Sequence, residues 1–172
     1  MMYRKNENNI GNFSSLLMKY PHASAELRGS ETYPNIYGTV RFYQTLKGVL
    51  IAAEVSGLPY SKENCSDRVF GFHIHGGSSC DGDMHDPFSK AMSHYDTNGC
   101  MHPFHAGDLP PLFGNKGYAF SAFLTDRFSV SEVTGRTVII HGSPDDFISQ
   151  PSGNAGEKLA CGIIMVCSKY CR

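Results

Sequence analysis

The sequence predicts an all-β protein built from short antiparallel strands. Runs of alternating apolar and polar residues, or runs rich in β-branched residues, recur at roughly ten- to fifteen-residue intervals along the chain. Gly, Pro, Asn and Asp separate these runs, and no segment has a long, capped helical periodicity. We therefore expect an eight-stranded antiparallel Greek-key barrel or sandwich of the immunoglobulin-like kind, with two long functional loops.

The predicted strands follow one another with turn-forming residues between them. They span residues 22–27, 38–44, 49–55, 69–75, 112–113 with their neighbours, 118–124, 136–141 and 159–166. Residues 76–108, rich in Gly, His, Asp and Cys, and residues 142–157, rich in Gly, Ser, Pro and Asp, lack the strand pattern. Loops of this length in a compact domain usually carry function.

Length and charge favour one domain without nucleic-acid or membrane partners. We divide the 172 residues into an N-terminal arm without a clear pattern, 1–20, and a domain, 21–172. Lys and Arg (15) nearly balance Asp and Glu (16), and no apolar run approaches the length of about 18 residues that a membrane helix needs. Because no secretory signal is visible, we expect a cytoplasmic protein as the sequence stands, or an exported one if a signal was removed.

Histidines are the strongest functional signal. Six of the eight His residues fall between positions 73 and 105. Neutral imidazole is the commonest protein ligand for zinc and copper, so this clustering predicts a metal site. A single His in such a segment is more often a solvated side chain, but that interpretation does not account for six of them.

The run Phe72-His73-Ile74-His75 fits a strand in which alternate residues share a face. Phe72 and Ile74 then point to the core, and His73 and His75 can share one metal. The strand that ends at His141 offers a third nitrogen, although a strand-end His that meets solvent is an equal alternative. His94, His102, His105 and Asp108 supply three nitrogens and one oxygen from one loop, a complete shell for tetrahedral zinc.

Four motifs carry most of these residues. They are GFHIHGGSSC (71–80), HAGDLP (105–110), GRTVIIH (135–141) and GNAGEKLACGII (153–164). With shorter matches at 38–42 and 55–59, the chain from about residue 23 to residue 166 resembles the copper/zinc superoxide dismutases of the bacterial kind. The resemblance implies an enzyme that converts superoxide to oxygen and hydrogen peroxide by copper redox cycling, with a structural zinc.

The resemblance also implies a set of metal ligands. The implied copper ligands are His73, His75, His94 and His141, and the implied zinc ligands are His94, His102, His105 and Asp108. His94 would bridge the two metals and act in catalysis by accepting a proton when copper is reduced. Because His102 and His105 lie closer together than is usual in the family, His85 competes as a zinc ligand. We favour His102 and expect His85 to be a solvated loop residue.

Two cysteines have counterparts in the family. Cys80 and Cys161 correspond to the pair that forms its intrasubunit disulfide, and two buried thiols are the alternative. The resemblance assigns no role to four further cysteines, Cys65, Cys100, Cys167 and Cys171, for which free thiols and a Cys167–Cys171 link are equal alternatives.

One aspartate has a counterpart as well. Asp145 corresponds to the residue that accepts hydrogen bonds from a copper ligand and a zinc ligand, here His73 and His102. Such acceptors fix the tautomer and orientation of metal-bound imidazoles. The adjacent Asp146 is the competing candidate.

Lys158 stands where the family usually has an arginine beside the copper. A lysine keeps the positive charge that attracts a small anion, but it lacks the planar fork that docks the anion in a fixed pose. We therefore assign Lys158 a catalytic role, with a solvated lysine as the alternative. The segment 147–153 is shorter than the charged guiding loop of the family, so we expect weak steering.

The alternative function is a non-catalytic domain of the same fold that binds only zinc or carries copper for delivery. Four copper imidazoles argue against a zinc-only protein, whereas Cys167 and Cys171 are soft ligands that a copper carrier would expose. For the enzyme, the expected partner is the superoxide anion. A homodimer is left open by the sequence.

Overall fold

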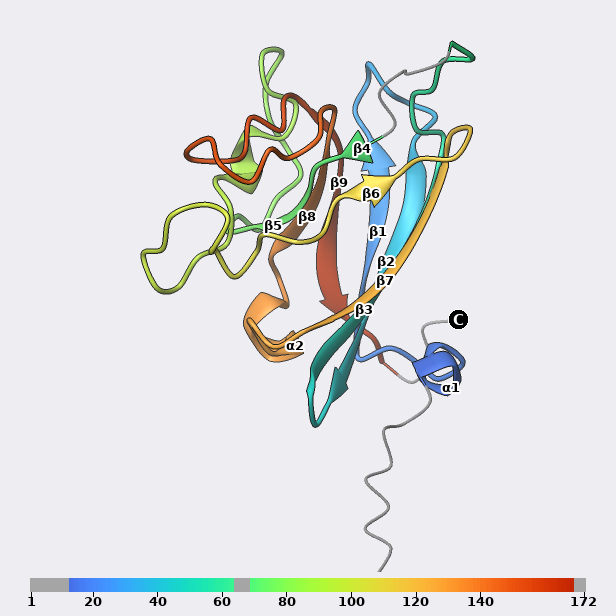
Figure 1. Cartoon of the computed structure of the whole chain (residues 1–172), viewed down its shortest axis with the longest axis vertical. Coiled ribbons are helices and arrows are strands. Elements are labelled where there is room, and N and C mark those ends of the chain that lie inside the picture. Colours follow the sequence, from blue (N-terminus) through green and yellow to red (C-terminus); the bar gives the residue numbers. More distant parts are fainter. Residues whose placement is uncertain (1–12, 64–68, 169–172) are drawn as a thin grey trace, which may run out of the picture.

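The computed structural model describes residues 13–63 and 69–168, and it has the predicted all-β architecture (Figure 1). Seven strands form one curled antiparallel sheet in the order β5-β8-β9-β1-β2-β3-β7, and β4 pairs with β6. The strands are β1 Ala23–Gly29, β2 Tyr37–Thr45, β3 Gly48–Ser56, β4 Val69–Phe70, β5 Phe72–His75, β6 Leu112–Phe113, β7 Tyr118–Thr125, β8 Thr137–His141 and β9 Lys158–Val166. The helices are short: α1 Phe13–Leu17, η1 Ser89–Ala91 and α2 Val130–Val133.

Seven of the predicted strands agree with the structure to within two residues at each end. The expected strand 69–75 is instead divided at Gly71 into β4 and β5, which belong to different sheets. The Gly71 N–H donates to the carbonyl of Ser143, and the Gly71 carbonyl accepts from the N–H of His141. A side chain at Gly71 would place its Cβ 2.8 Å from the Cβ of Ala155, so glycine permits this close crossing.

The core lies against one face of the curled sheet. Phe72 and Ile74 of β5 are fully buried in it, as the alternation predicts. The opposite face of β5 is also buried, because the loop that follows the strand folds back over His73 and His75. β5 therefore presents apolar side chains to the core and imidazoles to a second, loop-covered interior.

The sheet order brings the two long loops to one side of the molecule. β5 and β8 are neighbours, and the loops that leave them, 76–111 and 142–157, gather beside that edge of the sheet (Figure 1). In the loop after β5, the N–H of Tyr95 donates to the carbonyl of Ile74, and the N–H of Ile74 donates to the carbonyl of Gly107. The loop thus passes along β5 in two separate stretches.

The N-terminal segment is partly described. Leu16 and Leu17 of α1 pack against Tyr43, Leu50 and Ala52 on the outer side of the sheet. The division into residues 1–20 and 21–172 stays a prediction. No helix within the described residues is long and apolar enough to span a membrane.

Candidate metal centre

Two groups of donor side chains meet where the long loops cover β5. The first consists of His73, His75, His94 and His141, and the second of His94, His102, His105 and Asp108. Within each group the candidate ligand atoms all lie within 4.8 Å of one another. Only His105 is partly exposed, and His94 belongs to both groups. The donor side chains come from two strands, β5 and β8, and from the loop after β5. They include every ligand candidate from the sequence except His85, which is exposed and belongs to neither group.

In the first group, the outward ring nitrogens are already engaged. His73 donates from Nε2 to Asp145 Oδ2 (2.8 Å), His75 from Nδ1 to the Met92 carbonyl (2.8 Å) and His141 from Nδ1 to the Gly156 carbonyl (3.2 Å). The inward nitrogens of these rings are then lone-pair acceptors. His75 Nε2 and His141 Nε2 nevertheless lie 3.2 Å apart, facing each other. Two lone pairs at that distance repel unless a cation lies between them.

Unpartnered atoms mark the same place. Among the described residues, four buried side-chain atoms have no hydrogen-bond partner: His73 Nδ1, His94 Nε2, His102 Nδ1 and Thr137 Oγ1. Buried polar atoms are normally satisfied, so an unpaired nitrogen in a donor group indicates a ligand-binding position. The three imidazole nitrogens belong to the two donor groups, and a metal ion in each group would account for them, whereas Thr137 lies in neither group.

The second group surrounds one carboxylate. Asp108 Oδ1 lies 2.7 Å from His94 Nδ1, and Asp108 Oδ2 lies 3.2 Å from Nδ1 of both His102 and His105. Three imidazole nitrogens and one carboxylate oxygen fit the tetrahedral shell of zinc. The donor set leaves no open position, which is typical of structural zinc sites.

Burial keeps three imidazoles of the first group, those of His73, His75 and His141, in their ligating form. Burial lowers the pKa of His73, lowers that of His75 well below its usual value, and together with the neighbouring His73 lowers that of His141 to about 3. These rings are consequently neutral at pH 7, and metal binding need not first remove a proton from them.

Asp145 connects the two groups. Its Oδ2 accepts from His73, and its Oδ1 accepts from His102 Nε2 (2.9 Å) and from the Phe147 N–H (2.7 Å). Burial by itself raises the pKa of this carboxyl, but the hydrogen bonds prevail and lower the pKa to about 2. Asp146, the competing candidate, is exposed and accepts from N–H groups of its own loop. Gly153 permits the close cover over Asp145, because a Cβ there would lie 2.0 Å from Oδ1.

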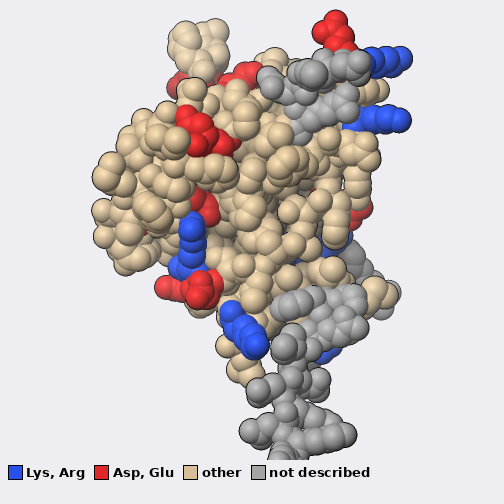
Figure 2. Space-filling model, viewed as in Figure 1, with Lys and Arg blue, Asp and Glu red and all other residues tan. Residues whose placement is uncertain are grey.

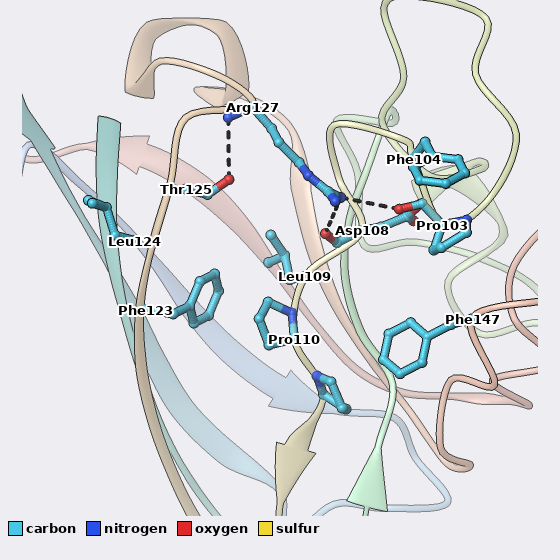
Figure 3. Close-up of a pocket in the computed structure, with 11 residues that line it drawn as sticks. Pro103, Phe104, Asp108, Leu109, Pro110, Phe123, Leu124, Thr125, Arg127 and Phe147 are labelled. Atoms are coloured by element: carbon cyan, nitrogen blue, oxygen red, sulfur yellow. Dashed lines mark hydrogen bonds between the residues drawn. The ribbon is translucent and has the colours of Figure 1, made fainter. Parts of the chain in front are cut away.

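Sequence reasoning missed two residues that hold the loop backbone. The Arg127 guanidinium donates from Nη1 to the carbonyls of Pro103 (3.3 Å), His105 (3.1 Å) and Asp108 (3.0 Å), and Figure 3 shows the bonds to Pro103 and Asp108. Gln150 accepts from the N–H of His102 and donates to its carbonyl. Both side chains form hydrogen bonds with main-chain atoms that are far away in sequence. No pattern of residue types predicts a contact of this kind.

The structure confirms the predicted disulfide between Cys80 and Cys161. It joins the loop after β5 to β9. Cys100 and Cys167 form no disulfide with any described residue. Cys65 and Cys171 lie outside the described residues.

Lys158 lies at the mouth of the first group. It lines an open cavity of about 510 Å³ together with His75, His94 and His141. Its ammonium is bound, because Nζ lies 2.6 Å from Asp86 Oδ2 and 3.1 Å from the Phe88 carbonyl.

Comparison with known proteins gives a consistent result. Residues 36–164 match the family model described as copper/zinc superoxide dismutase. The chain is 32% identical over 157 residues to "Superoxide dismutase [Cu-Zn] 2" of Aquifex aeolicus, covering 83% of this chain and 85% of that protein. It is 34% identical to "Superoxide dismutase [Cu-Zn]" of Legionella pneumophila (76% and 79% covered). It is 31% identical to the protein of the same name from Paramecium bursaria Chlorella virus 1 (89% and 83% covered).

Replacing Arg127 should weaken metal binding at the second group. In Arg127→Gln the loop carbonyls lose their shared donor, so we expect the affinity of that group for Zn²⁺ to fall about tenfold. Competition with a chromophoric chelator measures this affinity. Arg28→Gln, an exposed arginine on β1, is the matched control and should change nothing. Equal affinities for parent and Arg127→Gln would show that the loop needs no such support.

Removing the disulfide should destabilise the metal-free protein. Cys80 and Cys161 are 81 residues apart, and in the chain-entropy model a bridge of that span contributes up to about 4 kcal/mol. Cys161→Ser should therefore lower the melting temperature in a calorimetric scan and loosen metal binding, whereas Cys100→Ser should not. A melting temperature that is the same with and without reductant would contradict this expectation.

Proposed function

The chain belongs to the copper/zinc superoxide dismutase family, and from this premise we propose that it converts superoxide to oxygen and hydrogen peroxide at the cavity bounded by His75, His94 and His141. One observation carries the proposal: two complete, buried donor groups share His94. When bound, copper supplies the one-electron redox chemistry, and zinc orients the shared imidazole. The catalytic reading is favoured over a non-catalytic metal-binding domain because both groups are complete and one of them opens to a cavity.

For four of the six histidines we assign the ligand atom from the hydrogen bond of the opposite ring nitrogen, and for His94 and His105 we assign the zinc-binding atom as the nitrogen that faces Asp108. Copper would be held by His73 Nδ1 and by Nε2 of His75, His94 and His141. Zinc would be held by Nδ1 of His94, His102 and His105 and by the Asp108 carboxylate. Asp145 fixes the ring planes of His73 and His102, so one carboxylate orients a ligand in each group.

His94 is assigned the proton-carrying role. Its Nδ1 faces Asp108, and its buried Nε2 has no partner among the described residues. Within the described part of the chain, no backbone carbonyl or second carboxylate competes for Nε2, so this nitrogen could take up a proton when it does not hold copper and release it toward the cavity. Lys158 stands at the cavity mouth, where its ammonium attracts the superoxide anion.

The copper-carrier alternative receives no support from Cys167, the one of its two proposed thiols that the structure describes. A carrier needs soft, exposed ligands. Cys167 is half-buried, and its Sγ donates to Ser24 Oγ at 3.3 Å. The other thiol of that hypothesis, Cys171, lies outside the described residues.

Superoxide is the small-molecule partner that the family assignment supplies. We propose that nucleic acids and membranes are not partners. In support, Lys and Arg side chains are few and scattered on the face shown in Figure 2, several of them beside acidic groups, and form no basic patch there.

We also propose a homodimer that uses the outer face of β7. Tyr118, Phe120 and Leu124 alternate along this edge strand and are 39–56% exposed. The groove of about 410 Å³ in Figure 3 continues the apolar surface, with Phe104 and Phe147 on its rim. Neighbouring exposed apolar side chains of this kind are typical of an interface, and a second copy of the chain would cover them.

Metal content tests the proposed function directly. The reconstituted protein should hold one copper and one zinc per chain, and His94→Ala should lower both, because it is shared. Elemental analysis measured alongside superoxide turnover checks this, with the exposed His85→Ala as a control that keeps both metals. If His94→Ala keeps full metal content and normal turnover, the assignment of a shared ligand is wrong.

Sedimentation tests the dimer. The parent should sediment as a dimer at micromolar concentration, and Phe120→Ser should shift it toward monomer, since the change removes exposed apolar area from β7. Leu46→Ser, at the fully exposed turn between β2 and β3, should leave the dimer intact. A monomeric parent would refute the proposal.

A further inference from the structure

Lys158 is held in place before any anion arrives. Only 15% of its side chain is exposed, and two of its three N–H groups point to Asp86 Oδ2 and the Phe88 carbonyl. A lysine stem is flexible, so an isolated ammonium at this mouth would sample many positions. The two acceptors restrict it to one position, and no described residue accepts from the third N–H.

Asp86 is itself fixed by its own loop. Its Oδ1 accepts from the Phe88 N–H (3.0 Å), and its main-chain N–H donates to Asp83 Oδ1 (3.0 Å). Its carbonyl accepts from the N–H groups of Asp83 and Ser89. The turn is tight, because a Cβ on Gly82 would lie 2.1 Å from that carbonyl oxygen. The carboxylate is therefore presented to Lys158 in one orientation.

A covalent link reinforces the pair. Cys80 precedes Asp86 in the same loop, and Cys161 follows Lys158 in β9, so the disulfide and the ion pair join the same two segments. An exposed ion pair contributes little to stability, largely because two mobile side chains must be ordered to form it. Here the backbone of both partners is already held together, and the lysine is mostly buried.

We propose that Asp86 is a positioning residue for Lys158 that also offsets its charge at the cavity mouth. This inference rests on the proposed function. Asp86 holds the flexible lysine in one position, as the planar shape of a guanidinium would do without a partner. The negative charge of Asp86 also lowers the net positive charge at the cavity mouth. Lys158 is the only Lys or Arg among the described residues lining the cavity, and Asp96 lines it as well. An approaching monoanion therefore meets a lysine whose field Asp86 reduces.

Azide, a small monoanion, is the probe that tests the proposal on the copper- and zinc-loaded protein. Its dissociation constant is read from the Cu(II) absorbance at low ionic strength for the parent, Asp86→Asn, Lys158→Gln and the double variant. The local charge changes by +1, by −1 and by zero, respectively. We expect Asp86→Asn to bind azide about fivefold more tightly, Lys158→Gln about fivefold more weakly and the double variant like the parent. Salt near 0.5 M should shrink all differences.

Asp81→Asn is the matched control, because it removes one carboxylate from the same loop that pairs with Lys90 instead. It should bind azide like the parent. If Asp86→Asn binds azide no more tightly than the parent, or Asp81→Asn tightens it equally, the charge-offsetting role is wrong.

A second measurement isolates the positioning role and needs no metal. In the metal-free protein, Asp86→Asn should lower the melting temperature when Lys158 is present and leave it unchanged when residue 158 is Gln. Equal shifts in both backgrounds would overturn the pairing. If the parent neither binds azide at copper nor turns over superoxide, the proposed function fails instead, while this melting comparison still decides whether the pair exists.

Discussion

The carboxylate of Asp145, held between His73 and His102, is the contact on which both metal groups depend. His73 comes from β5, His102 from the loop after β5, and Asp145 from the loop between β8 and β9. Because each imidazole donates outward to Asp145, each turns its other nitrogen inward as a lone pair. Burying a charged carboxylate is unfavourable, and three donors offset that cost strongly enough to lower its pKa to about 2. The backbone of Gly153 lies so close to the Asp145 carboxylate that a side chain at residue 153 would collide with it.

The sequence was most informative where the chain is periodic. Strand positions and the paired His73 and His75 follow from the two-residue repeat, which is a local property. The break at Gly71 was not predictable, because it depends on the approach of Ala155 from a distant loop. Likewise, the position of His94 depends on how its loop lies along β5. Only the resemblance to a known family therefore suggested that both donor groups share His94. Arg127 and Gln150 form hydrogen bonds with backbone atoms of other loops, and such contacts cannot be predicted from the order of residues.

The long loops owe their order to contacts that are not periodic. Strand-like docking on β5, the disulfide, Arg127 and Gln150 each hold a different stretch of backbone. In this arrangement the donor atoms of each group lie within 4.8 Å of one another. A site organised in this way has less conformational entropy to lose when metal binds, so more of the ligand-binding free energy remains as affinity.

The same rigidity has an electrostatic consequence at the cavity mouth. The buried imidazoles of His75 and His141 are neutral at pH 7, and the ammonium of Lys158 is paired with Asp86. If Asp86 offsets the charge of Lys158 as proposed, protein side chains contribute little net positive charge where the anion enters. The metal ions, when bound, would then supply most of the attraction, and at about 0.15 M ionic strength screening limits it to about 8 Å. On this proposal, capture of superoxide depends on the shape and position of the cavity more than on a long-range field, the same expectation that the short segment 147–153 raises.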